Sequence, residues 1–107
     1  MKKLIALAAL VCGTAHAEFY SGNDLLAKLQ SSEPVERMIG AGYITGVFDA
    51  ASGASQCPPE NVTIGQVRDM VKSHLEATPT LRHYPADVQV RFVLTRAWPC
   101  AKKGTAL

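Results

Sequence analysis

The chain has 107 residues, of which 48% are hydrophobic and 19% are charged, and its formal net charge is +2. This length accommodates one small domain with a modest core, and it argues against a multidomain protein. The balanced charge provides no basic surface for a nucleic-acid partner, so none is expected.

The first 17 residues have the three parts of a cleavable export signal. Lys2 and Lys3 precede an apolar run over residues 4–11. Residues 15–17 are Ala-His-Ala, a triplet with small residues at its first and third positions, which predicts cleavage by signal peptidase between Ala17 and Glu18. The apolar run is much shorter than the ~20 residues of a membrane-spanning helix, so no stable span is expected. Cleavage would leave nine basic and nine acidic side chains. The sequence therefore predicts a signal peptide over residues 1–17 and a periplasmic domain with a formal net charge of zero over residues 18–107.

The three cysteines divide between the signal and the mature domain. Cys12 would leave with the signal, and Val11 before it disfavours a lipoprotein, whose lipidated cysteine usually follows Gly, Ala or Ser. Cys57 and Cys100 remain in an oxidising compartment, where one structural disulfide is expected. No histidine or further cysteine lies at metal-ligand spacing from either residue, so no metal or cofactor is expected.

Two helices are expected in the first half of the mature chain. The first starts near Ser21, with Ser21 or Asn23 as its cap, and ends near Ser32. The second runs from Pro34 to about Ala51, because proline is well suited to a first helical turn. Its apolar stripe consists of Met38, Ile39, Tyr43, Ile44, Val47 and Phe48.

Three glycines interrupt the second helix. Gly40, Gly42 and Gly46 each cost about 1 kcal/mol of helix stability relative to alanine. We expect another helix to approach closely at these positions, with a kink as the alternative. Asp49 lies near the C-terminal end, where the helix dipole disfavours a negative charge, and a hydrogen bond to the following turn would explain it.

Two more helices are expected in the second half. The third opens with a capping box in which Thr63 and Gln66 satisfy each other's backbone N–H groups, and it ends before Pro79. The fourth starts around Pro85 and ends at Trp98-Pro99-Cys100. Its apolar stripe is Ala86, Val90, Val93, Leu94 and Ala97, widened by Val88 and Phe92. The fold class is therefore predicted to be all-α, a compact small bundle of about four helices with one disulfide.

No catalytic constellation stands out. His74 at the edge of a helix and His83 in a connection are typical of surface or half-buried histidines, and the carboxylates lack paired spacing. The aromatic residues of the helices are expected in the core, with Tyr84, Phe19 and Tyr20 more open. We predict a binding protein and not an enzyme.

Short motifs follow one another in a fixed order over roughly residues 20–100. They are Gly22-Asn23-Asp24-Leu25-Leu26, Gly42-Tyr43-Ile44-x-Gly46-Val47-x-Asp49-Ala50, Cys57-Pro58, Val62-Thr63-x-x-Gln66, Leu75-x-x-x-Pro79 and Trp98-Pro99-Cys100. In this order and spacing, the motifs resemble the Rap/Tai immunity proteins of type VI secretion.

The resemblance implies a small helical periplasmic protein that binds and blocks a peptidoglycan amidase effector without chemistry of its own, in some members as a homodimer. The contacts are expected in the connections 51–56 and 76–84. Relatives often carry a further cysteine pair at positions that correspond to Leu29 and Gly40, so we expect the first helix to be held by leucine packing alone. The alternative function is a small periplasmic helper or stress chaperone.

Overall fold

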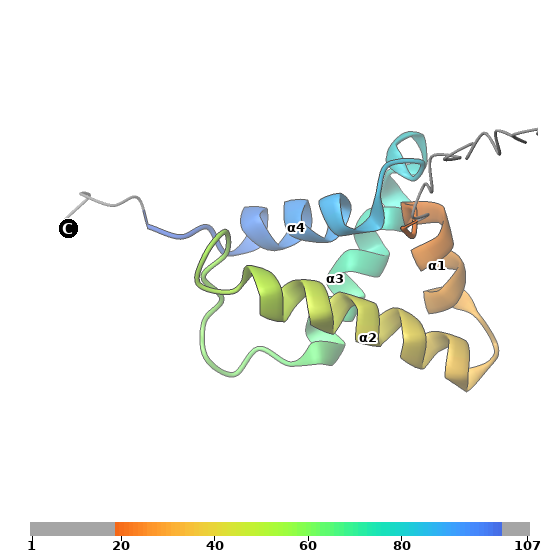
Figure 1. The fold of residues 1–107 in the computed structure, drawn as a ribbon, viewed down its shortest axis with the longest axis horizontal. Helices are drawn as coiled ribbons and strands as arrows, with labels where there is room; N and C mark the ends of the chain where they lie inside the picture. Colours follow the sequence, from red (N-terminus) through yellow and green to blue (C-terminus); the bar gives the residue numbers. More distant parts are fainter. Residues whose placement is uncertain (1–18, 102–107) are drawn as a thin grey trace, which may run out of the picture.

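The computed structural model describes residues 19–101, and within that range the chain forms four α-helices and no sheet strand. The elements are α1 (Gly22–Gln30), α2 (Pro34–Ala51), α3 (Ile64–Ala77), the short 3-10 helix η1 (Pro79–Leu81) and α4 (Ala86–Ala97). In Figure 1, α2 and α4 run in roughly the same direction, α3 crosses behind them, and α1 lies near their N-terminal ends. The predicted all-α architecture with one disulfide is confirmed. The predicted signal peptide and cleavage site lie outside the described residues.

The core is built from one apolar stripe of each helix. Its members recur at three- and four-residue spacing, which places them on one face of an α-helix. The buried residues are Leu25, Leu26 and Leu29 of α1, Ile44 of α2, Val67, Val71 and Leu75 of α3, and Ala86, Val90 and Leu94 of α4. Each large side chain among them stabilises the fold by roughly 1.5–3 kcal/mol on burial.

The N-terminal half of α2 departs from the predicted pattern. Met38 is 72% exposed and Ile39 is 41% exposed, although both were expected in the apolar stripe. The prediction was wrong for these two residues, because no described helix covers that side of α2. Tyr43, Val47 and Phe48 are partly buried and pack against the core, as expected.

Helix α1 is held by more than its leucines. The Ser21 hydroxyl accepts a hydrogen bond from the Asp24 N–H (3.2 Å), and the Asp24 carboxylate accepts from the Ser21 N–H (2.9 Å). These bonds from Ser21 lower the pKa of Asp24 below its usual value. The N–H groups of Gly22 and Asn23 donate to the carbonyls of Tyr84 and Arg82, each at 2.9 Å. The expectation that leucine packing alone holds α1 was therefore wrong.

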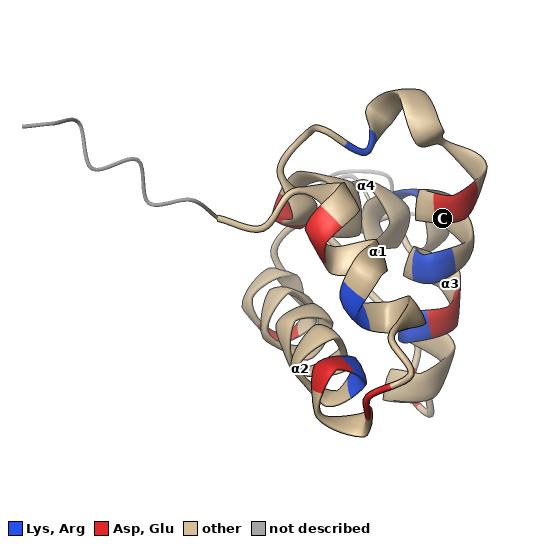
Figure 2. Cartoon of the chain, turned by 90° about the vertical axis from the view of Figure 1, so that its right-hand side faces the viewer, with Lys and Arg blue, Asp and Glu red and all other residues tan. Residues whose placement is uncertain are grey.

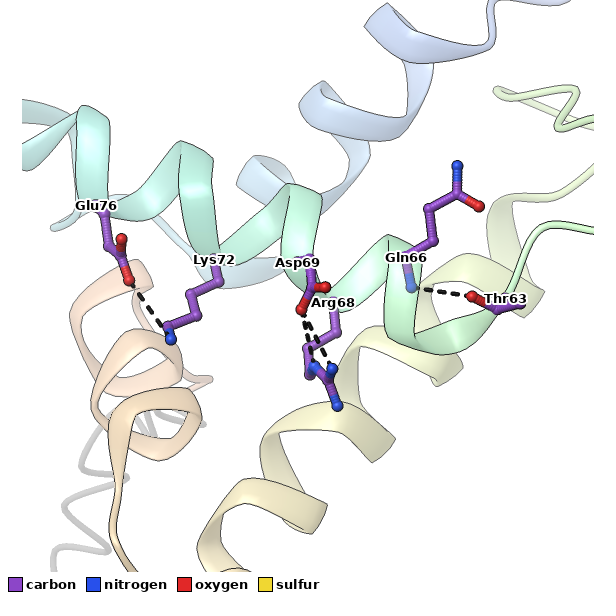
Figure 3. Close-up of polar contacts among 6 residues, drawn as sticks. All are labelled: Thr63, Gln66, Arg68, Asp69, Lys72 and Glu76. Carbon is purple, nitrogen blue, oxygen red and sulfur yellow. Dashed lines mark hydrogen bonds and ion pairs between the residues drawn. The ribbon is translucent and has the colours of Figure 1, made fainter.

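The start of α3 has half of the expected capping box. The Thr63 hydroxyl accepts from the Gln66 N–H at 3.1 Å, whereas the Gln66 side chain points away from Thr63 (Figure 3). Gln66 is thus an exposed residue whose backbone, and not its side chain, takes part in the cap. Exposed ion pairs continue along the same side of α3 in Figure 3, and such pairs contribute little to stability.

Gly40 is the one glycine of α2 that another helix approaches closely. A Cβ atom placed on Gly40 would lie 3.1 Å from Cδ2 and 3.5 Å from Cγ of Leu29. Leu29 and Gly40, the positions that the resemblance assigns to a further cysteine pair, are therefore neighbours across the α1–α2 contact.

This proximity predicts that a second disulfide forms in the Leu29→Cys/Gly40→Cys variant. The sulfur at position 29 would take the place of Leu29 Cγ, close to the distance that a bridge to residue 40 requires. Mass spectrometry and thiol titration after oxidative refolding are expected to find no free thiol. The matched control is Leu29→Cys/Gly42→Cys, since Gly42 has no neighbour within 4 Å. Equal cross-linking of both pairs would contradict the observed packing.

Candidate functional site

The disulfide joins the end of α4 to the segment before α3. Cys57 and Cys100 form the predicted bridge, with their Cα atoms 4.8 Å apart. The Cys57 N–H also donates to the Trp98 carbonyl at 2.8 Å. Trp98 packs against the core, and Pro99 follows as an exposed residue before the bridge. The terminal Trp-Pro-Cys motif therefore anchors the chain after α4.

The connection over residues 51–56 was one of two predicted partner contacts, and its geometry is that of a compact turn. The buried Gln56 side chain donates from Nε2 to the Phe48 carbonyl (3.1 Å) and to Ser52 Oγ (3.3 Å). Gly53 has a φ of +80°, which favours glycine. The exposed residues 52–55 are Ser, Gly, Ala and Ser, so the turn offers a partner few side-chain atoms.

Some of the α2 residues that carry the family resemblance pack against the core, and others are exposed. Tyr43 stacks on Tyr20 with ring centroids 5.4 Å apart, and burial, followed by the charge of Asp87, raises the pKa of Tyr43. Gly42 and Gly46 are exposed, and a Cβ atom on either would meet nothing within 4 Å. The predicted close approach was wrong for these two glycines. Asp49 is exposed at the last turns of the helix.

An exposed apolar surface extends from the second predicted contact, the connection over residues 76–84, to one side of α4. Val88 is 52% exposed and Phe92 is 50% exposed, one helical turn apart, and Tyr84 and Leu81 continue the surface. The core placement predicted for Phe92 was therefore wrong. We call the hollow among these side chains the α4 groove; it has a volume of about 240 Å³ and is lined by His74, Leu81, Tyr84, Val88, Gln89 and Phe92.

A buried amide lies in the α4 groove. Gln89 is only 4% exposed, and its Nε2 donates to the carbonyls of Leu81 (2.9 Å) and Tyr84 (3.2 Å). Its Oε1 is buried without a well-aligned donor among the described residues, and the neighbouring His74 ring interacts with it. Gln56 Oε1 and Arg82 Nε are buried in the same way, so the Gln89 oxygen does not by itself mark a binding site. No sequence pattern indicated the burial of Gln89, because a glutamine beside an apolar stripe is usually exposed.

His74 forms one side of the groove. Its ring lies 5.5 Å from that of Phe92, measured between centroids. Burial lowers the pKa of His74, and the neighbouring Gln89 carboxamide opposes that shift without forming a well-aligned hydrogen bond. The neutral imidazole is therefore the form that the folded protein favours.

The lowered pKa of His74 predicts acid destabilisation. A histidine whose pKa is lower when folded stabilises the fold fully above the unfolded value of about 6.5, and this contribution is lost as the pH falls through the folded pKa. The urea midpoint is expected to fall between pH 7 and pH 5, and to fall less in the His74→Gln variant. His83→Gln is the control, because His83 is exposed and lies outside the groove. Parallel pH profiles for the parent and His74→Gln would contradict the role of His74.

A second hollow beside α1 is larger but more polar. Its volume is about 400 Å³, and it is lined by Phe19, Tyr20, Asp24, Ala27, Lys28, Ser31 and Glu36. The charged groups there already have partners: Lys28 Nζ lies 2.7 Å from Glu36 Oε2, and Asp24 is bonded to Ser21. The charged groups of this hollow are thus already paired, whereas the α4 groove is lined mainly by apolar and aromatic side chains.

Charged residues are interspersed over the described surface. Figure 2 shows acidic and basic positions alternating on α1, α3 and the first turn of α2, without a large area of one sign. Among residues 19–101, no three His, Cys, Asp or Glu residues come together as a set that could hold a metal ion. In the same part of the chain, no helix has the length and hydropathy needed to cross a membrane. The α4 groove is therefore the leading candidate site, and its walls are suited to binding.

Comparison with known families identifies the family of the chain. A family model described as Rap1a immunity proteins matches residues 21–100, which covers α1 to α4 and both bridged cysteines. A search of curated proteins finds no match to the chain. Because the match spans most of the sequence, the chain belongs to the Rap1a immunity protein family, as its spaced motifs predicted.

Proposed function

We propose that this protein is a periplasmic immunity protein that binds a type VI secretion effector with peptidoglycan amidase activity and inhibits it without chemistry of its own. Residues 1–17 are the cleaved export signal in this proposal, and residues 18–107 are a single immunity domain. Peptidoglycan lies outside the cytoplasmic membrane, so an exported domain meets the effector where the effector acts.

The observation that carries the proposal is the family match over residues 21–100. Inhibition by binding requires a surface and not a reaction centre. The α4 groove supplies such a surface, since Tyr84, Val88 and Phe92 are each about half exposed on one side of the domain. Exposed apolar side chains grouped in this way are typical of protein–protein contact sites.

The test uses the amidase encoded beside the gene for this protein. The purified immunity protein is expected to co-elute with the amidase and to abolish its cleavage of peptidoglycan at equimolar concentration. Cells that receive the amidase in the periplasm are expected to survive only when the exported protein is co-expressed. The absence of both binding and protection in these assays would refute the proposal.

Two matched variants locate the contact. Val88→Arg places a charge in the α4 groove, and we expect it to lose binding and protection. Val35→Arg makes the same change at a valine that is 66% exposed on α2, away from the groove, and we expect binding to persist. Circular dichroism of both variants checks that the fold is retained, since neither valine is buried.

The resemblance also implies a homodimer in some relatives, and light scattering of the purified domain tests this proposal directly. A mass of one chain would contradict it. The same preparation separates immunity from the alternative of a stress chaperone. A chaperone would protect unrelated client proteins from aggregation at pH 2–3, whereas an immunity protein is expected not to.

A further inference from the structure

We propose that the outward face of α2 pairs with the same face of a second copy of this chain, with the two helices antiparallel about a two-fold axis at Gly42. This pairing assigns a surface to the homodimer considered above and does not depend on the effector. It also leaves the α4 groove free, since no residue of α2 lines that groove. Three features of α2 support the pairing: its apolar outward side, the order of large and small residues along it, and the charges at its two ends.

The side of α2 that faces away from the core is apolar over most of its length. Gly42 lies two residues, or about 200° of helical rotation, from the buried Ile44. On the same side as Gly42, Val35 is 66% exposed, Met38 is 72% exposed and Ile39 is 41% exposed. Residues 38–48 contain no charged side chain, and Figure 2 shows blue and red on the first turn of α2 and tan along the turns that follow it. A helix that is apolar on all sides is usually covered on all sides.

The sizes of the residues along this face suit a second copy that runs in the opposite direction. The large side chains Val35, Met38 and Ile39 lie in the N-terminal half of the face. The C-terminal half has Gly42 and Gly46, where an added Cβ atom would meet nothing within 4 Å. In an antiparallel pair centred on Gly42, Met38 lies at the level of Gly46 of the second copy, so a large side chain meets a gap. A parallel pair would place Met38 beside Met38 and leave the glycine half open.

The two ends of α2 carry complementary charge at equal distances from Gly42. Glu33 is the N-cap of α2, and within the described chain its side chain makes no capping hydrogen bond. Asp49 is exposed near the other end, where the helix dipole disfavours a carboxylate and the last turn has no basic residue. Val35 and Asp49 are each seven residues from Gly42, about 10 Å along the axis and about 20° around it. An antiparallel second copy would therefore bring its Asp49 to the uncapped start of α2, and the reverse.

The side chains around the first turn of α2 admit this carboxylate. Lys28 Nζ lies 2.7 Å from Glu36 Oε2, so the negative charge of Glu36 is already paired. Arg37 is exposed in the same part of the helix and offsets the charge of Glu33. The free N–H groups of the first turn and the helix dipole then determine which charge is favoured, and they favour a carboxylate.

The experiment measures self-association of the purified protein by sedimentation velocity from about 10 µM to about 1 mM. A contact of one helix from each copy is small, so the parent is expected to form a reversible dimer with a Kd on the order of 0.1 mM. Met38→Glu should weaken this dimer at least about tenfold, because it places two carboxylates in the apolar contact. Val88→Arg is the control on α4 and should dimerise as the parent does. Circular dichroism checks that both variants fold, since both side chains are exposed.

Charge changes at the ends of the face test the antiparallel register. Val35→Arg brings a cation to Asp49 of the second copy and should tighten the dimer about three- to tenfold, because the symmetric pair forms twice. Val35→Glu should weaken the dimer by a similar factor, and Val35→Glu/Asp49→Arg should restore it. In a parallel pair, position 35 would meet position 35, so arginine and glutamate there would both weaken the dimer.

The glycines give a readout that packing within one chain would not produce. Gly42→Ala/Gly46→Ala is expected to weaken the dimer, because the added methyl groups hold the two helices further apart. The same change favours α2 within one chain. The two effects separate by concentration, since unfolding at micromolar concentration reports the single chain.

Two kinds of result would overturn the proposal. A parent protein that stays a single chain up to about 1 mM would show that this face binds no second copy. A dimer that Met38→Glu leaves intact, or that both Val35 variants weaken, would place the contact on another surface or in a parallel register. The amidase co-elution and protection assays decide the proposed function separately, and their failure would not alter the sedimentation result.

Discussion

Removal of the Cys57–Cys100 bridge is expected to lower the free energy of unfolding by about 4 kcal/mol in the Cys57→Ser/Cys100→Ser variant. The bridged residues are 43 positions apart, so the closed loop contains α3, η1 and α4. Closing a loop of this length restricts the unfolded chain, which is the main source of the stabilisation. A domain of this size has a total stability of only about 5–10 kcal/mol, so the variant should be close to unfolding at 37 °C.

The measurement is a urea titration followed by circular dichroism under oxidising and reducing conditions. The parent protein should lose stability on addition of dithiothreitol, and the double serine variant should be insensitive to it. A single-cysteine variant is avoided because the remaining thiol could pair between molecules. An unchanged midpoint in the double variant would show that the hydrogen bond from Cys57 to Trp98 and the packing of Trp98 hold this junction by themselves.

The helices could be predicted from local signals. Pro34 at the start of α2, Thr63 before α3 and Pro79 after it are side-chain or backbone constraints that act within one turn, so they mark helix ends without knowledge of the tertiary fold. The pairing of Cys57 with Cys100 followed from the count of cysteines expected in the mature domain. The 3-10 helix η1 was not predicted, because its three residues carry no periodic pattern.

The candidate site was not predicted, because the apolar stripe expected for α4 was too wide and included residues from two sides of the helix. Val90 and Leu94 are buried while Val88 and Phe92 are half exposed, although all four are apolar residues of α4. The two pairs are offset by two residues, about 200° around an α-helix, so they face opposite sides of α4. Gln89 was missed for a different reason: its burial depends on carbonyls of η1 and of the following turn, which no sequence pattern brings together.

The glycines of α1 and α2 are expected to respond to alanine with opposite signs. A Cβ atom on Gly42 or Gly46 would meet nothing within 4 Å, so Gly42→Ala/Gly46→Ala should raise the free energy of unfolding by about 2 kcal/mol through helix propensity. A Cβ atom on Gly22 would collide with Gln89 Nε2 and lie 2.9 Å from the Arg82 carbonyl oxygen. Gly22→Ala should therefore lower the free energy of unfolding by roughly 1–3 kcal/mol.

Thermal and urea unfolding of the two variants tests these signs, with the parent measured in parallel. Stabilisation by Gly22→Ala would contradict the observed contact with α4, and destabilisation by the α2 double variant would show that its open side is packed. The α2 double variant also tests whether the exposed side of α2 takes part in protection. Because Gly42 and Gly46 lie outside the α4 groove, the stabilised variant should protect cells from the amidase as well as the parent does.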